Sequence, residues 1–334
     1  MASERQALIL ILLSLFTFSF IMSSQASTGE IAIYWGQNYG DGNLTATCDT
    51  GNYGIVILAF FTTFGCGRTP AWNFDGHCGH WSPCTKLKHE IDHCQEKGIK
   101  VFLSIGGASE NYSLCSPEDA KEVAEYLYNK FLSDYIGRDG PLGPVTLDGI
   151  DFHIEAGSNL YWDNLARELD TIRQKKHFYL SAAPKCPIPD HYLDTAIKTG
   201  LFDYIFVQFY NSFPCQYSDS NPAFLFESWD DWTSLVLPNN SVFMGLPAAP
   251  DAAPNGGYIP PQEVLIPYVL PYIKKASNYG GIMLWNRSAD VQSHYSDIIK
   301  PYVPKDVLQF VTGVSKGIYE CVSAALPRFL PKPY

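Results

Sequence analysis

Three titratable side chains recur at every second position in one short stretch of the sequence, at Asp151, His153 and Glu155. Successive side chains of a β-strand point to opposite faces, so a strand over residues 147–155 would place all three groups in one row. Such a row is costly to remove from water unless its members pair with one another or with a ligand. Carboxyl and imidazole groups gathered in this way are the groups with which enzymes move protons. The row therefore indicates a functional site, and the alternative is an exposed amphipathic edge strand.

The rest of the chain alternates short β-branched or aromatic runs with longer helical patterns. Eight segments are expected to be strands, namely residues 31–35, 55–61, 101–105, 147–155, 178–183, 204–210, 242–246 and 281–285. Six segments between them are expected to be helices, namely residues 86–96, 117–131, 161–174, 190–198, 222–236 and 261–275. Strands that alternate with helices favour a parallel sheet with right-handed crossovers.

The number and order of these segments predict an α/β fold, a single-domain (β/α)8 TIM barrel, because eight parallel strands close such a barrel. The 334 residues are enough to form it. A doubly wound open sheet is the alternative. No glycine-rich dinucleotide or phosphate loop follows any of the expected strands, which disfavours the open sheet and gives no sign of a cofactor.

In a TIM barrel the site lies at the carboxyl ends of the strands, and here these ends are rich in aromatic and amide side chains. The residues at these ends are Gln37, Phe60, Phe61, Ser104, Ile105, Gly106, Gly107, Glu155, Gln208, Tyr210, Asn211, Trp285 and Asn286. Any one of the aromatic residues is more typical of the core or the rim. As a set they indicate a groove with ring faces and amide groups, which suits sugars.

Net charge and the first residues of the chain restrict the partners and the destination of the protein. A net charge of -11 without a Lys/Arg cluster argues against nucleic acid. Residues 1–26 are expected to be a secretory signal peptide, because Arg5 precedes the apolar run 7–22 and small residues follow it. A membrane anchor is the alternative, although the run is short for a span and no other stretch suits a membrane. We expect a secreted, extracellular protein, or a vacuolar one if residues 304–334 carry a targeting signal.

Secretion would make the nine cysteines candidates for disulfides, and their spacing gives no zinc pattern. Because the count is odd, at least one cysteine stays without an intramolecular partner. Four sequons, at Asn43, Asn111, Asn239 and Asn286, are compatible with a secreted glycoprotein.

Several of the strand segments carry motifs that together indicate a family. The sequence reads IAIYWGQN from residue 31, LSIGG from 103, DGIDF from 148, VQFYN from 207, GLPAAP from 245 and MLW from 283. These motifs resemble those of the plant class III chitinases of glycoside hydrolase family eighteen, the hevamine-like group. The resemblance runs from about residue 29 to 303. It implies that residues 27–303 form a chitinase-like TIM barrel, that chitin or chitooligosaccharides are its ligands, and that no metal or cofactor takes part.

The resemblance also implies roles for single residues. The family signature is Asp-x-x-Asp-x-Asp-x-Glu, and Asp148, Asp151 and Glu155 match its first, second and last positions. Glu155 would then be the general acid, with Asp151 beside it, and Tyr210 would steady the N-acetyl group of the substrate. Positions that line the sugar groove match Gln37, Phe60, Asn73, Gln208 and Trp285. The family disulfides would join Cys48 to Cys94, Cys78 to Cys84 and Cys186 to Cys215, which leaves Cys66, Cys115 and Cys321 as extra cysteines.

His153 stands where the family signature has its third aspartate. In this family the N-acetyl oxygen of the substrate is the nucleophile, and that aspartate orients the group and balances the charge of the cyclic intermediate. A neutral imidazole brings no negative charge, and an imidazolium opposes the positive charge and favours ionised Glu155. The loss of one such electrostatic contact lowers the rate on the order of a hundredfold to a thousandfold.

Three functions follow as hypotheses. The first is a chitin-binding protein of plant defence whose hydrolysis is impaired at His153. The second is an active but slow endochitinase that cleaves β-1,4 linkages. The third is an inhibitor of a microbial glycosidase, because xylanase inhibitors with an incomplete acidic motif also resemble class III chitinases. Seed storage is a lesser variant of the first.

Overall fold

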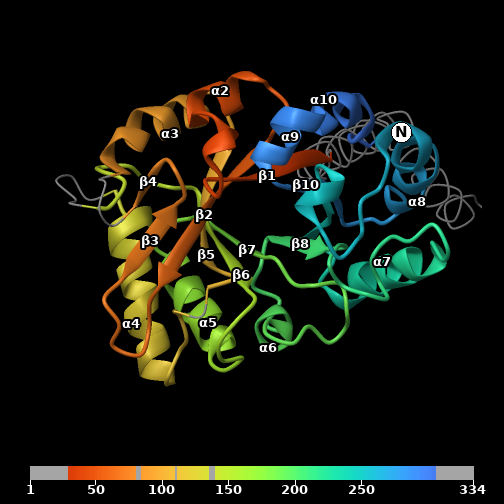
Figure 1. Ribbon diagram of the computed structural model, residues 1–334. Helices are drawn as coiled ribbons and strands as arrows, with labels where there is room; N and C mark the ends of the chain where they lie inside the picture. Colours follow the sequence, from red (N-terminus) through yellow and green to blue (C-terminus); the bar gives the residue numbers. More distant parts are fainter. Residues whose placement is uncertain (1–28, 80–83, 110, 135–139, 306–334) are drawn as a thin grey trace, which may run out of the picture.

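Eight parallel strands close into a ring in the computed structural model, which describes residues 29–79, 84–109, 111–134 and 140–305. They are β1 (Glu30–Trp35), β2 (Ile55–Thr63), β5 (Lys100–Gly107), β6 (Gly149–Ile154), β7 (Tyr179–Ala182), β8 (Tyr204–Gln208), β9 (Ser241–Pro247) and β10 (Tyr279–Trp285). β1 pairs with both β10 and β2, which closes the barrel (Figure 1). The predicted TIM barrel is confirmed, and the alternative of an open sheet is wrong.

The strands are apolar on both faces because both faces are covered. In β2, Ile55, Ile57 and Ala59 belong to the apolar cluster inside the barrel, whereas Val56 and Leu58 belong to the layer between strands and helices. Alternate side chains of this apolar run therefore pack into two different cores, one inside the barrel and one between the strands and the helices.

Nine α-helices of the described residues surround the ring. They are α2 (Leu44–Asp49), α3 (Leu87–Glu96), α4 (Pro117–Leu127), α5 (Trp162–Arg173), α6 (Asp194–Ile197), α7 (Ala223–Leu235), α8 (Leu270–Ile273), α9 (Arg287–Ser293) and α10 (Tyr295–Ile299). α4 continues as a wide π-type turn over Tyr128–Leu132, and a similar segment over Pro261–Val269 precedes α8. All six predicted helices are therefore present, although the one expected over residues 190–198 is reduced to α6.

The shortening of that helix has a local cause. The Asp190 carboxylate accepts hydrogen bonds from the backbone N–H groups of Lys185 (2.9 Å), Tyr192 (3.0 Å) and Leu193 (2.7 Å). A side chain that satisfies three backbone donors holds a turn, so the helix begins only at Asp194.

One short hairpin was not expected from the sequence. β3 (Ala71–Phe74) pairs antiparallel with β2 and with β4 (Cys78–Gly79), and it extends the sheet beyond the barrel. Short strands that contain Asn and lie among Gly and Pro residues give little strand signal. The hairpin places Trp72 opposite Phe61 of β2, and the next residue, Asn73, accepts a hydrogen bond from Gln37 through its carbonyl.

Four disulfides within the described part of the chain fasten these connections. The structure joins Cys48 to Cys94, Cys78 to Cys84 and Cys186 to Cys215, which are the three pairs that the resemblance implies. A fourth bridge joins two of the extra cysteines, Cys66 and Cys115. The predicted signal peptide and the end of the chain with Cys321 lie outside the described residues.

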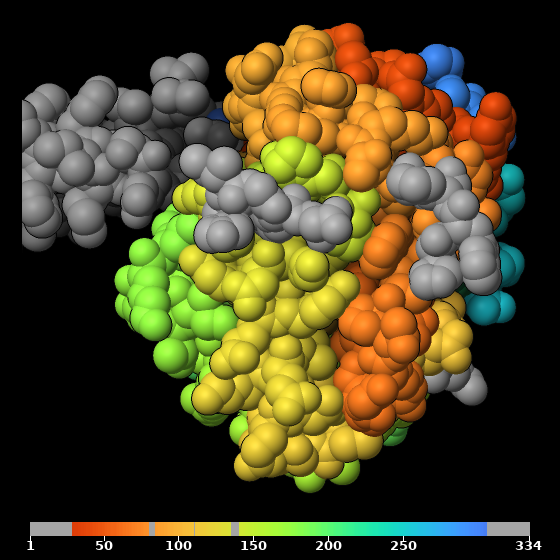
Figure 2. Space-filling model, turned by 90° about the vertical axis from the view of Figure 1, so that its left-hand side faces the viewer, coloured from red at the N-terminus to blue at the C-terminus, as the bar shows by residue number. Residues whose placement is uncertain are grey.

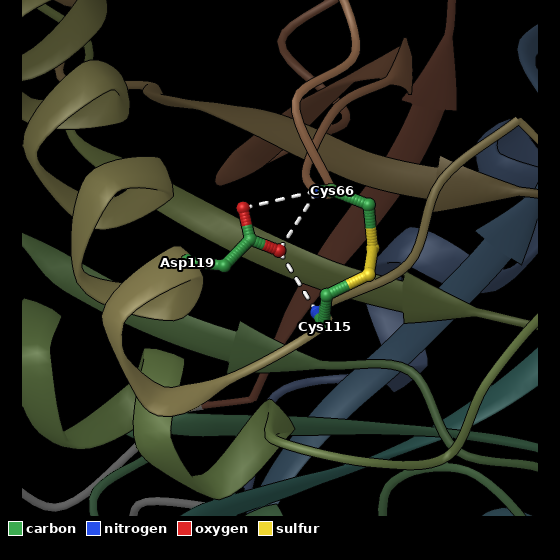
Figure 3. Close-up of side chains that lie close together, drawn as sticks. All are labelled: Cys66, Cys115 and Asp119. Atoms are coloured by element: carbon green, nitrogen blue, oxygen red, sulfur yellow. Dashed lines mark hydrogen bonds between the residues drawn. A yellow bond between two sulfur atoms is a disulfide. The ribbon is translucent and has the colours of Figure 1, made fainter.

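The Cys66–Cys115 bridge ties the β2–β3 connection to the start of α4. Figure 2 shows the orange β2–β3 segment running beside the yellow surface of α4. The Asp119 carboxylate accepts hydrogen bonds from the backbone N–H groups of Cys66 (2.8 Å to Oδ2) and Cys115 (2.9 Å), as Figure 3 shows. Although these side chains are of metal-ligating types, both sulfurs are consumed in the disulfide, so the cluster is structural.

No helix in the described part of the chain has both the length and the apolar character to span a bilayer.

Candidate active site

Asp151 lies at the centre of the barrel with no solvent exposure. Its carboxylate accepts hydrogen bonds from three hydroxyl groups, those of Tyr34 (2.8 Å), Ser104 (2.7 Å) and Ser181 (2.7 Å). These donors come from β1, β5 and β7 and compensate the desolvation of the carboxylate. The sequence named Ser104 among the strand-end candidates but did not identify Tyr34 and Ser181 as site residues, although strand alternation places each on the inner face.

His153 lies one layer above Asp151 and is only 3% exposed. Its Nδ1 is 3.1 Å from the Tyr34 hydroxyl oxygen. Burial and the Asp151 carboxylate raise the pKa of Tyr34 well above its usual value, so this hydroxyl keeps its proton and donates it to Asp151. The hydroxyl oxygen can then only accept a hydrogen bond from His153, and Nδ1 must carry a hydrogen.

The other imidazole nitrogen of His153, Nε2, is 3.4 Å from Oε1 of Glu155. Nδ1 already carries a hydrogen. A further proton between Nε2 and Oε1 gives an imidazolium and a carboxylate if it is on His153, or a neutral imidazole and a carboxylic acid if it is on Glu155. Burial raises the pKa of Glu155, but the positive charge and hydrogen bond of His153, then the charge of Lys185 and a hydrogen bond from Gln208, lower it to about 2. Glu155 is therefore ionised at neutral pH, and its carboxylate faces Nε2 of His153.

The end of β6 that carries Glu155 is fixed by a buried tyrosine. The Tyr112 hydroxyl accepts hydrogen bonds from the backbone N–H groups of Glu155 and Ala156, both 3.0 Å, and donates to the Gly107 carbonyl at 2.6 Å. Burial raises the pKa of Tyr112 to about 12, against the effect of these backbone N–H groups. The hydroxyl therefore stays protonated and fixes the backbone at Glu155.

Tyr210 follows β8 and is 4% exposed. Its hydroxyl is buried and has no hydrogen-bond partner among the described residues. Burial and then the negative charges of Glu155 and Asp151 raise its pKa well above the usual value, so it stays protonated. A buried hydroxyl without a partner is costly in the free protein, and a ligand with an acceptor atom at this point would remove that cost.

Two aromatic rings face the buried row from the strand ends. The Phe60 ring centroid lies 4.9 Å from that of His153 and 6.1 Å from that of Trp285, to which the Phe60 ring is nearly parallel. Trp285 is only half-buried and its ring lies 5.5 Å from that of Tyr34. These rings form an apolar wall beside the row of titratable groups.

The predicted amide residues lie around the same barrel mouth, but most of their side-chain hydrogen bonds are made to backbone groups. The Gln37 amide nitrogen donates to the carbonyls of Ala59 (2.8 Å) and Asn73 (3.2 Å). Gln208 donates to the Ala183 carbonyl at 2.8 Å. Exposed Asn73 therefore lies beside Gln37 in space, as a shared groove requires.

Asn211 and Asp148 have other positions. The Asn211 carboxamide oxygen accepts a hydrogen bond from the backbone N–H of Asn255 (2.9 Å), so it ties two loops of the rim together. Asp148 lies at the amino end of β6 and accepts from the Val101 N–H (2.8 Å) and the Gln95 amide (2.9 Å). It is therefore a structural residue at the opposite end of the barrel from Glu155.

Known proteins resemble this chain over most of its length. The family described as glycosyl hydrolases family 18 matches residues 30–258. Acidic endochitinase SE2 of Beta vulgaris is 50% identical over 296 residues, which cover 88% of this chain and 98% of that protein. The ICChI chitinase of Ipomoea carnea is 50% identical, with a TM-score of 0.78 over 82% of this chain and 100% of that chain.

Two further solved structures that resemble this chain are named as an inhibitor and as a lectin. The xylanase and alpha-amylase inhibitor protein XAIP-II of Scadoxus multiflorus is 44% identical, with a TM-score of 0.76 over 81% of this chain and 97% of that chain. The tamarind chitinase-like lectin is 40% identical, with a TM-score of 0.72 over 80% and 98%. Relatives at these identities are therefore named as enzymes, as an inhibitor and as a lectin.

Proposed function

This chain belongs to family 18 of the glycosyl hydrolases, and on that premise we propose that it binds chitin or N-acetylglucosamine oligosaccharides at the barrel mouth and hydrolyses them slowly or not at all. The observation that carries the proposal is the contact of 3.4 Å between His153 Nε2 and Glu155 Oε1. The rest of the proposal follows from the effect of that contact on the protonation and charge of the two side chains.

Hydrolysis of a glycosidic bond needs a general acid that holds a proton when the leaving oxygen departs. Glycosidases meet this need with a carboxyl group whose pKa is raised toward neutral pH. In this chain the pKa of Glu155 is lowered to about 2, because His153, Lys185 and Gln208 together outweigh the effect of burial. Glu155 is then ionised at neutral pH and seldom available as an acid.

His153 also fails to meet the second requirement of the reaction, which is a negative charge beside the intermediate. The family uses the N-acetyl oxygen of the substrate as nucleophile, and the resulting cyclic intermediate is positively charged. The resemblance places an aspartate where this chain has His153. An imidazolium there repels the intermediate, and a neutral imidazole leaves its charge without compensation.

Binding depends less on His153 than hydrolysis does. The Tyr210 hydroxyl is a buried donor without a protein partner, and it suits the carbonyl oxygen of an N-acetyl group. Trp285 is only half-buried and provides a ring face on which a sugar can stack, and the buried Phe60 ring lies nearly parallel to it. These features support retained binding of N-acetylated sugars when turnover is impaired.

A slow but active endochitinase is the second candidate. It is favoured by relatives named acidic endochitinases at 50% identity, and by the hydroxyl groups that hold Asp151 in the centre of the barrel. The loss of one electrostatic contact slows an enzyme on the order of a hundredfold to a thousandfold without abolishing it.

An inhibitor of xylanases or other microbial glycosidases is the third candidate, supported by the likeness to the inhibitor protein of Scadoxus multiflorus. Such a function would use a surface outside the groove. An extracellular destination suits all three candidates and is supported by the four disulfides.

Titration and turnover on the same oligosaccharide separate these candidates. We expect the purified protein to bind a chitin oligosaccharide by calorimetry and to release products far more slowly than an active family member assayed beside it. Turnover equal to that of the active member would reject the impairment. Absent binding together with inhibition of a xylanase would favour the third candidate.

A further inference from the structure

Lys185 lies at the barrel mouth beside Glu155. Where β6 pairs with β7, Asp151 lies opposite Ser181, whose hydroxyl reaches the Asp151 carboxylate. Just beyond Ala182, where β7 ends, the Ala183 N–H still donates to the Phe152 carbonyl, and the charge of Lys185 acts on the Glu155 carboxylate. On its other side Lys185 pairs with Gln208 of β8. The register therefore places the Lys185 side chain in the top layer of inward-facing groups.

The ammonium group of Lys185 has no hydrogen bond or ion pair within the described part of the chain, although the residue is half-buried. The two nearby carboxylates are already engaged. Glu155 lies against His153, and Asp190 accepts from the backbone N–H of Lys185 at 2.9 Å and from two more backbone N–H groups. The positive charge of Lys185 is therefore only partly balanced, and its donors are available to a ligand.

The strand order fixes which end of the groove this charge occupies. Three strands separate β7 from β1 in either direction around the ring, so the two strands face each other across the barrel. Gln37 follows β1, and Asn73 lies on β3 beside β2. A sugar chain that enters beside Gln37 and Asn73 and crosses the mouth reaches Lys185 at the far end.

We propose that Lys185 is a specificity-determining residue that sets the charge preference of this end of the groove. N-acetylated sugars, which are neutral, and sugars with an anionic group are accepted there, and glucosamine units with a protonated amine are rejected. The inference rests on the proposed function, because it concerns the sugar that the groove binds.

The charged groups at this end of the groove support a preference for neutral or anionic sugars over protonated glucosamine. Asp151 is enclosed by hydroxyl donors, and the Glu155 carboxylate lies against the His153 imidazole. Neither carboxylate is free to pair with the ammonium of a deacetylated sugar. Asp190 is held by three backbone N–H groups. The charge left to meet a ligand at this end is that of Lys185, and like charges in a partly desolvated mouth repel each other more strongly than in water.

The test compares a fully acetylated chitin oligosaccharide with the deacetylated oligosaccharide of equal length, by titration calorimetry at mildly acidic pH. For Lys185→Gln we expect the affinity for the deacetylated ligand to rise roughly three- to tenfold, the scale of one charge pair in a partly solvated site, while the acetylated ligand is nearly unaffected. Lys185→Glu should extend the gain, and added salt should reduce the difference between wild type and variants.

Lys198→Gln is the matched control. It makes the same charge change just after α6, but its ammonium pairs with Asp194 on the surface, so it should leave both affinities as in the wild type. If both Lys185 variants discriminate between the two ligands as the wild type does, the proposed role of Lys185 is wrong, and the proposed function is unaffected. A wild type that does not bind the acetylated ligand at all would overturn the proposed function and this inference with it.

Discussion

The His153 imidazole lies between the Tyr34 hydroxyl, 3.1 Å from Nδ1, and the Glu155 carboxylate, 3.4 Å from Nε2. Tyr34 in turn donates to Asp151 at 2.8 Å. The Asp151 and Glu155 carboxylates are therefore linked through Tyr34 and His153, neither of which is negatively charged, and do not face each other. In an acid–base site, a like-charged neighbour is one means of keeping a carboxyl group protonated, and this arrangement replaces it with a donor that keeps Glu155 ionised.

The first prediction concerns stability at low pH. The pKa of Glu155 is about 2 in the folded protein, against an ordinary value of 4.5. Folding favours the ionised form, so this stabilisation is complete above about pH 4.5 and is lost as the pH falls toward 2. The free-energy difference between wild type and Glu155→Gln should shrink by up to about 3 kcal/mol over that range. Urea unfolding at several pH values measures it, and parallel curves for the two proteins would contradict it.

Tyr210→Phe should separate binding from stability. The Tyr210 hydroxyl makes no hydrogen bond among the described residues, so its removal should leave the unfolding free energy unchanged or slightly higher. Affinity for an acetylated oligosaccharide should fall by about 1 kcal/mol, the scale of one hydrogen bond. A variant that loses stability but keeps its affinity would show that the hydroxyl serves the fold.

Trp285→Ala should weaken oligosaccharide binding by about 1 kcal/mol or more through lost ring stacking. The control is Tyr268→Ala, which removes a ring that is 68% exposed on the segment Pro261–Val269, away from the mouth. Calorimetry should register a loss in the first variant only. Equal affinities in both variants would remove Trp285 from the sugar site.

The sequence predicted the row Asp151, His153 and Glu155 because strand alternation is a local property that needs no knowledge of neighbours. It could not reveal that Tyr34 joins Asp151 to His153, since those hydrogen bonds cross 117 and 119 positions and depend on how the barrel closes. Whether two of the extra cysteines pair stayed open for a similar reason, because the Cys66–Cys115 bridge depends on the distance between two connections.

The pH dependence of any residual activity should change in His153→Asn. In the wild type, charging of the cluster His153–Glu155 opposes the cationic intermediate, so activity should fall on the acidic side. Asparagine keeps a polar group at this position but cannot take up a proton. The acidic limb that belongs to the cluster should therefore be absent from the variant, and its apparent pKa in the wild type describes the coupled pair. The same limb in both proteins would show that His153 does not control the charge of the site.

The most direct test of the account is the rate of chitin oligosaccharide hydrolysis by His153→Asp. The change places a carboxylate beside Glu155, removes the imidazole that lowers the pKa of Glu155 and offers negative charge to the intermediate. We expect the hydrolysis rate to rise on the order of a hundredfold or more over the wild type, and to return to background when Glu155→Gln is added. No increase in a folded variant that still binds the oligosaccharide would contradict the claim that His153 is what impairs hydrolysis.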